Sequence, residues 1–175
     1  MVECTPKVLN RRLVLIRHAK SAYPVGVGDH ERPLSARGIA DAGALRKWPP
    51  LRGLFSGEVA VLVSSAKRTQ DSWALIGGAD CPPHRTEPLL YEAAPRVLLA
   101  LINTTAPATE TLIIVAHNPG LEDLASMIVR NRESTAFVQL DSKFPTCAVA
   151  VFEVSDFANV NEGNALLTQF VVPRG

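Results

Sequence analysis

Short runs of apolar residues recur along the chain, and polar residues close each of them. The first run, residues 13–16, is followed at once by Arg17 and His18. A run this short and this rich in Val, Ile and Leu is typical of a strand that is buried on both faces, rather than of a helix. The strong runs predict strands at residues 12–17, 59–63 and 111–116, and a weaker run predicts one at 85–90.

Helical patterns separate these strands. Apolar residues at positions 39, 42, 45 and 48 predict a helix that Pro49 and Pro50 stop. Further helices are predicted after Ser65 to about residue 76, over 94–103 and over 119–130. The last segments, 146–154 and 165–172, are β-rich and predict an antiparallel pair. The whole pattern predicts an α/β fold, a three-layer α/β/α sandwich whose central sheet is mainly parallel with an antiparallel edge.

Length and composition narrow the possible functions. The 175 residues favour one domain over 1–175, since single cores usually run to about 100–200 residues. Hydrophobic residues make up 47 % of the chain, which excludes a mainly disordered protein. The 18 Lys and Arg residues against 17 Asp and Glu leave a formal charge of +1, too little to hold the protein on nucleic acid or on an anionic membrane. We therefore expect no nucleic-acid and no membrane partner.

Cysteine usage favours a reducing, cytoplasmic location. Cys4, Cys81 and Cys147 are odd in number, far apart and without CxxC spacing. The apolar run at 13–16 is too short for a secretion signal or a membrane span. No cysteine has an arginine at the C-x5-R spacing of cysteine-dependent phosphatases, so cysteine catalysis is not expected.

Polar residues at the ends of the strong strands are the candidate functional residues. In open α/β sheets, ligands bind beyond the carboxyl ends of the strands. This sequence places Arg17 and His18, Arg68, and His117 there. If these strands are neighbours, the two arginines and two histidines converge on one edge, where such a cluster calls for an anion. Arginine forks match phosphoryl oxygens and an imidazole can attack phosphorus, so the pattern predicts phosphoryl transfer.

The same segments resemble the signatures of the histidine phosphatase (phosphoglycerate mutase-like) superfamily. Residues 13–21 resemble its strand-one RHG motif, and residues 64–72 resemble its SxxxRxxQT block. Residues 32–38 resemble the R-P-L-[ST]-x-x-G block of small SixA-type phosphohistidine phosphatases. The matches follow in family order from residue 13 to about 120. The resemblance implies a phosphoglycerate mutase-like fold and a phosphatase that works through a phosphohistidine intermediate.

The resemblance also implies a role for each of five residues. His18 would be the nucleophile, with its other ring nitrogen oriented by a backbone carbonyl, and Arg17, Arg68 and His117 would hold the phosphoryl oxygens. Glu92, with a pKa raised by burial, would protonate the leaving group and then activate the attacking water. No metal and no other cofactor is implied, because the arginines and imidazoles already supply positive charge.

Some assignments stay open at this level. Glu87 and Glu122 are alternatives to Glu92 as the acid. Ala19 stands where the family has glycine, which affects how closely the backbone can approach phosphate, and Ser72 stands where it has threonine.

The substrate is not set by these motifs. A phosphohistidine-bearing protein is expected, because no large insertion that could form a specificity lid separates the blocks. The alternatives are a small phosphorylated metabolite, a mutase reaction, or a catalytically silent phosphate-binding module. Residues 22–33 and 77–95 are the loops expected to shape the leaving-group pocket. The oligomeric state stays unknown.

Overall fold

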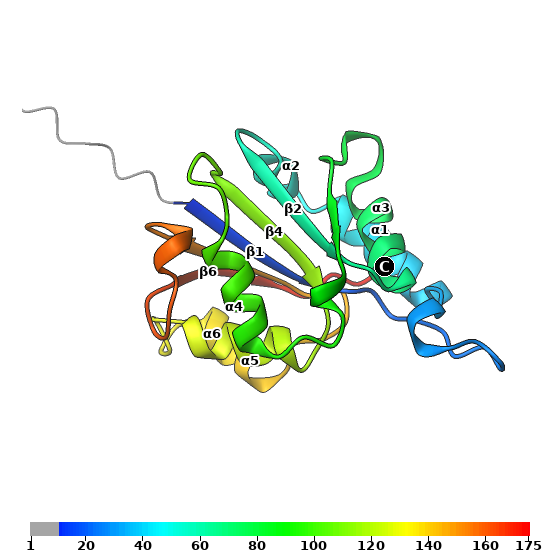
Figure 1. Ribbon diagram of the computed structural model, residues 1–175. Helices are drawn as coiled ribbons and strands as arrows, with labels where there is room; N and C mark the ends of the chain where they lie inside the picture. Colours follow the sequence, from blue (N-terminus) through cyan, green and yellow to red (C-terminus); the bar gives the residue numbers. More distant parts are fainter. Residues whose placement is uncertain (1–10) are drawn as a thin grey trace, which may run out of the picture.

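Six strands form one mixed sheet in the computed structural model, which describes residues 11–175 (Figure 1). The strands are β1 (Arg11–Arg17), β2 (Val59–Ser64), β3 (Arg85–Glu87), β4 (Thr111–Ala116), β5 (Val149–Val154) and β6 (Leu166–Val171). Their order across the sheet is β3-β2-β4-β1-β5-β6. The first four in that order are parallel, whereas β5 and β6 are antiparallel to their neighbours. The predicted parallel sheet with an antiparallel edge is confirmed. Cys4 lies outside the described residues.

Helices cover both faces of the sheet, as predicted. One face carries α1 (Ala36–Arg46), α2 (Leu51–Leu54) and α3 (Lys67–Gly77), and the other carries α4 (Pro95–Asn103), α5 (Gly120–Ile128) and α6 (Thr135–Ser142) (Figure 1). Single 3-10 turns complete the chain: η1 (Asp29–Glu31), η2 (Gly78–Asp80), η3 (Pro88–Leu90) and η4 (Phe157–Asn159). Within residues 11–175, no helix is both long and apolar enough to cross a membrane.

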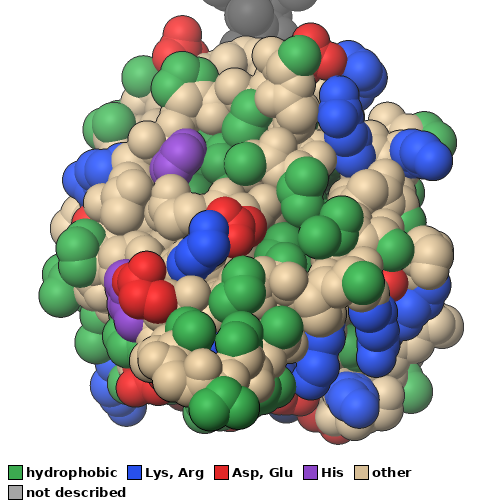
Figure 2. Space-filling model, turned by 90° about the vertical axis from the view of Figure 1, so that its right-hand side faces the viewer, with side chains coloured by type: hydrophobic (Ala, Val, Ile, Leu, Met, Phe, Trp, Pro, Cys, Tyr) green, Lys and Arg blue, Asp and Glu red, His purple; other side chains and the backbone are tan. Residues whose placement is uncertain are grey.

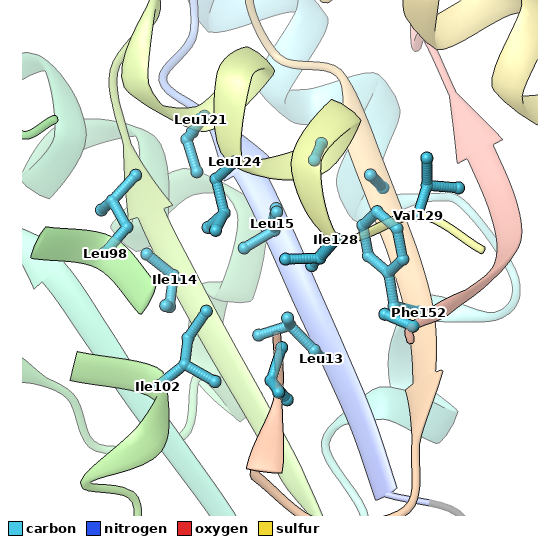
Figure 3. Close-up of a cluster of buried hydrophobic side chains, with 14 of the residues drawn as sticks. Leu13, Leu15, Leu98, Ile102, Ile114, Leu121, Leu124, Ile128, Val129 and Phe152 are labelled. Carbon is cyan, nitrogen blue, oxygen red and sulfur yellow. The ribbon is translucent and has the colours of Figure 1, made fainter. Parts of the chain in front are cut away.

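The alternation of side chains along β1 divides the core into two layers. Leu13 and Leu15 pack toward α4 and α5, where they lie among residues such as Ile128 (Figure 3). Val14 and Ile16 point to the opposite face and pack in the layer of α1 and α3. Because both faces of β1 are buried, the apolar run 13–16 is continuous and the polar residues of the strand lie at its two ends.

The secondary-structure prediction extends one strand too far and does not include helices α2 and α6. The strand predicted over 85–90 ends at Glu87, because Pro88 has no N–H to donate to a ladder and instead begins η3. Helix α6 was not predicted, although Ser134 caps it by accepting a hydrogen bond from the Phe137 N–H. Only Phe137 and Leu140 of α6 are fully buried, which is too little periodicity to identify the helix from the pattern alone.

The 32–38 block connects the site-bearing end of β1 to α1. Ser35 caps α1 through the Gly38 N–H at 3.1 Å, and its own N–H and hydroxyl donate to the Lys20 carbonyl. A Cβ on Gly38 would lie 2.1 Å from that carbonyl oxygen. The glycine of the block therefore permits α1 to approach the backbone two residues after His18.

Candidate active site

The carboxyl ends of β1 and β4 bring the two candidate histidines together. These strands are parallel neighbours with Arg17 opposite Ala116, so the next residues, His18 and His117, leave the sheet at the same level. Their ring centroids lie 5.1 Å apart. Arg68 approaches from the first turn of α3, which follows β2 on the other side of β4. The convergence of two histidines and two arginines that the sequence indicates is thus present.

His18 is held in the form that a nucleophile needs. Its side chain is almost fully buried, and Nδ1 lies 2.7 Å from the Ala19 carbonyl oxygen, as expected for orientation by a backbone carbonyl. In neutral His18 the proton therefore sits on Nδ1, and Nε2 keeps its lone pair. Burial, together with the smaller effects of the Arg68 and Arg17 charges, lowers the pKa of His18 to about 4, although the hydrogen bond to the Ala19 carbonyl acts to raise it. His18 is therefore neutral at pH 7.

The two residues that depart from the family motifs, Ala19 and Ser72, contact each other directly. The Ala19 N–H donates to the Ser72 hydroxyl at 2.9 Å, and that hydroxyl donates to the Arg68 carbonyl. Both side chains are fully buried. The Ala19 methyl is accommodated inside the core behind the site, and the Ser72 hydroxyl links the His18 segment to α3.

His117 has one ring nitrogen paired and one without a partner. Nε2 lies 2.8 Å from the Ser64 hydroxyl, which is fully buried at the end of β2. Nδ1 is buried and forms no hydrogen bond. Burial, together with smaller effects of His18 and Arg68, lowers the pKa of His117 to about 3. If the Ser64 hydroxyl donates to Nε2, Nδ1 carries the proton and can donate it to an oxyanion.

The two arginines are held by different loops. Arg17 donates through Nη1 to the Phe144 carbonyl at 2.7 Å, while its buried Nε has no partner. Burial lowers the pKa of Arg17, and the nearby Glu122 carboxylate opposes that effect. Arg68 donates to the backbone oxygen of Asp29 at 2.7 Å and to its carboxylate at 3.0 Å.

The prediction that Glu92 is buried is wrong. Its side chain is exposed rather than buried, and its backbone has a φ of 50°. The turn is held close to the site because Gly120 permits α5 to contact the Ala93 carbonyl, which a Cβ would approach to 1.9 Å. Burial therefore does not support an acid role for Glu92, and that role depends on the position of the residue beside the site.

The two alternative acids are engaged in the structure of the loops. Glu87 accepts the Leu89 N–H at 3.2 Å and pairs with Arg85 at 3.0 Å. Glu122 accepts from the Asn118 amide at 2.7 Å and from the Phe144 N–H at 3.2 Å. Among the described residues, the Glu92 carboxylate forms no such bond, which leaves it the most available of the three.

Sequence reasoning assigned no role to Ser64, Asp29 or Tyr91. Ser64 carries a signal, since it is the first residue of the 64–72 block and ends a strong strand. Asp29 and Tyr91 belong to no motif, although they lie in the segments 22–33 and 77–95 that are expected to shape the leaving-group pocket. The Tyr91 ring stands edge-on to His117, with centroids 5.5 Å apart, and its hydroxyl donates to Asp29 at 2.7 Å.

The surface around the carboxyl ends of the strands is mixed in charge. Figure 2 shows the side of the molecule toward which β1, β2 and β4 run, where acidic, basic and histidine side chains lie among exposed hydrophobic ones. Over residues 11–175, no group of three or more His, Cys, Asp or Glu side chains is placed to hold a metal ion.

The chain matches known proteins over most of its length. The sequence profile of the histidine phosphatase superfamily (branch 1) matches residues 13–152. The chain belongs to this superfamily. It is 39 % identical over 162 residues to the uncharacterized protein Rv1276c of Mycobacterium tuberculosis, a match that covers 91 % of this chain and 100 % of that one.

Solved histidine phosphatases share the fold. A protein from Nakamurella multipartitia, assigned as the phosphohistidine phosphatase SixA, superposes with a TM-score of 0.79 at 29 % identity, over 93 % of this chain and 96 % of that one. The protein histidine phosphatase SixA complexed with tungstate superposes with a TM-score of 0.69 at 21 % identity, over 93 % and 97 % of the two chains. This superfamily member is therefore SixA-like and has the phosphoglycerate mutase-like fold, and its family supports phosphatase activity.

Proposed function

We propose that the protein hydrolyses a phosphorylated substrate through a covalent phosphohistidine on His18, with phosphohistidine on a protein as the substrate class. The observation that carries this proposal is a pair of buried donors without partners beside the nucleophile: Nε of Arg17 and Nδ1 of His117. A buried donor without a hydrogen bond costs about 1–3 kcal/mol. Phosphoryl oxygens placed between His18 and these donors would satisfy both.

The reaction has two displacements at phosphorus. In the first, Nε2 of His18 forms a bond to phosphorus while the bond to the leaving group breaks. Arg17, Arg68 and His117 stabilise the negative charge on the three equatorial oxygens. In the second, a water oxygen forms a bond to phosphorus while the bond to Nε2 breaks, and phosphate leaves.

Glu92 is proposed to serve both steps from its exposed turn. It donates a proton to the leaving atom in the first step and takes one from the attacking water in the second, so the enzyme returns to its starting state. An imidazole leaving group depends less on such a donor than an alkoxide does. An acid on an exposed turn therefore fits phosphohistidine better than an alkyl phosphate.

The test is to trap the intermediate. Wild-type protein incubated with a phosphorylated substrate and quenched in alkali should carry an acid-labile phosphoryl group on His18. His84→Ala, which changes an exposed histidine that bonds Gln70, is the matched control and should be labelled and active like wild type. His18→Ala should neither label nor turn over. Turnover by His18→Ala would exclude the proposed nucleophile, and an inactive wild type with every phosphorylated substrate would indicate a silent binding module.

A further inference from the structure

A carboxylate lies directly against the arginine that is proposed to bind phosphate. Asp29 begins η1 at the inner end of the 22–33 loop, and its Oδ2 lies 3.0 Å from Nη2 of Arg68. The same oxygen accepts from the Tyr91 hydroxyl at 2.7 Å, and Oδ1 accepts from Nη1 of Arg32 at 2.7 Å. The backbone oxygen of Asp29 takes a second Arg68 donor at 2.7 Å. This arrangement pins the 22–33 loop to the phosphate-binding arginine.

These contacts keep Asp29 negatively charged. The hydrogen bonds from Tyr91 and Arg32, together with the charge of Arg68, hold its pKa well below the usual range. Its field reaches the catalytic pair, because it acts to raise the pKa of His117 against the burial that lowers it. Asp29 is therefore a fixed negative charge beside the site and cannot serve as a proton donor.

The Asp29 carboxylate lies on the solvent-exposed side of the site. The Asp29 side chain is 46 % exposed, whereas that of Arg68 is 6 % exposed and His18 is 9 % exposed. In an in-line displacement, the leaving group departs opposite to the attacking atom. Because His18 forms the buried floor, the leaving group points outward and passes the rim on which Asp29 lies.

Other charges also lie near the rim. Arg32 pairs with Asp29 at 2.7 Å and so offsets part of its charge; the guanidinium also donates to the Ser21 hydroxyl and the Ala22 carbonyl, and it stacks on the Tyr23 ring. Glu92 adds a second exposed carboxylate next to Tyr91. Two exposed carboxylates, those of Asp29 and Glu92, thus lie near the rim, and the buried guanidinium of Arg68 lies below it.

We propose that Asp29 selects substrates by the charge of their leaving group. It disfavours phosphoryl donors that carry a carboxylate or a second phosphate near the scissile bond, and it favours neutral or cationic donors such as the imidazole of phosphohistidine. This inference rests on the proposed function, since it assumes that Arg68 binds the phosphoryl group. It adds to the proposed function the residue by which the enzyme would prefer proteins bearing phosphohistidine over anionic metabolites.

The expected discrimination is about tenfold, which corresponds to about 1.4 kcal/mol. That value lies between the interaction of two unit charges about 4 Å apart in water and the same interaction near a protein surface. The interaction of a half-exposed carboxylate such as Asp29 with a charged leaving group should have an energy in this interval.

The test compares two ligands that differ only in charge. Phenyl phosphate and a carboxyphenyl phosphate are titrated calorimetrically against His18→Ala, which cannot turn them over, with and without Asp29→Asn. The neighbouring Glu31→Gln is the matched control, because its exposed carboxylate bonds His30 and not Arg68. The measured quantity is the ratio of the two dissociation constants. Any loss of Arg68 orientation weakens both ligands and cancels in that ratio.

The ratio should favour phenyl phosphate in the parent and in Glu31→Gln, and the preference should shrink about tenfold in Asp29→Asn. An unchanged ratio in Asp29→Asn, or an equal change in Glu31→Gln, overturns the charge selection while leaving the phosphatase proposal standing. Failure of both ligands to bind the parent would overturn the inference, because the inference requires a phosphoryl site beside Asp29. Trapping of the His18 intermediate in wild type decides the proposed function independently.

Discussion

Replacing Ser64 with alanine should impair the reaction through His117 without unfolding the protein. The Ser64 hydroxyl is fully buried and lies 2.8 Å from Nε2 of His117. When that hydroxyl donates a hydrogen bond to Nε2, Nδ1 keeps the N–H that is proposed to meet a phosphoryl oxygen. Without it, the ring can carry its proton on Nε2 instead and turn a lone pair toward the anion. His117 would then repel the group it should bind.

The size of the effect follows from the burial of the pair. Leaving one partner of a buried hydrogen bond unsatisfied costs about 1–3 kcal/mol, which corresponds to a loss of about 5- to 150-fold in kcat/KM if it is expressed in the transition state. The assay is steady-state hydrolysis of an aryl phosphate, with thermal unfolding as the check on the fold. Nitrogen chemical shifts of His117 report the tautomer directly.

The adjacent serine provides the control. Ser65 makes an equivalent bond, 2.9 Å from Nε2 of His30, but outside the catalytic pair. Ser65→Ala should change kcat/KM by no more than about twofold. Wild-type kcat/KM in Ser64→Ala, an equal loss in Ser65→Ala, or an unshifted His117 tautomer would refute the assigned role of Ser64.

Four further outcomes are expected. Gly38→Ala should lower the free energy of unfolding by about 2 kcal/mol or more in urea titrations, because its Cβ would lie 2.1 Å from a backbone oxygen. Gly43→Ala in the same helix meets nothing within 4 Å and should raise the free energy of unfolding by about 0.5–1 kcal/mol. Similar effects of the two substitutions would show that the close approach at Gly38 is not the cause. An NMR titration should give His18 a pKa near 4. The free energy of unfolding should fall as the pH drops from about 6.5 toward 4, because the unfolded chain takes up the proton first. A titration midpoint of His18 near 6.5 would contradict the burial argument. Hydrolysis should survive EDTA, and a loss restored by one divalent ion would show that a metal is required. Glu92→Gln should slow the hydrolysis of alkyl phosphates far more than that of aryl phosphates or phosphohistidine. Arg68→Ala should slow the hydrolysis of all three by a similar factor of about 10²–10³. An equal loss for all leaving groups in Glu92→Gln would exclude Glu92 as the acid.

Local patterns were enough to predict the framework and the central residues. Buried parallel strands leave continuous apolar runs, so β1, β2 and β4 are visible in the chain, and the residues after each run lie at one edge of the sheet. The positions of His18 and His117 follow from this pattern alone. The cost of polar groups inside a sheet confines them to such ends, which is why the signal is strong.

Tertiary structure decided how these residues are held and tuned. The Arg17 guanidinium is held by the carbonyl of Phe144, 127 positions away, and Arg68 is held by Asp29, 39 positions away. No periodicity encodes such contacts, because they depend on where loops from different elements meet. Burial decided the rest: it depresses the pKa of both histidines, whereas Glu92, expected to be buried, lies exposed on its turn. Desolvation is a property of the assembled surroundings, so the residue types could predict the chemistry of the site but not the protonation states in which it works.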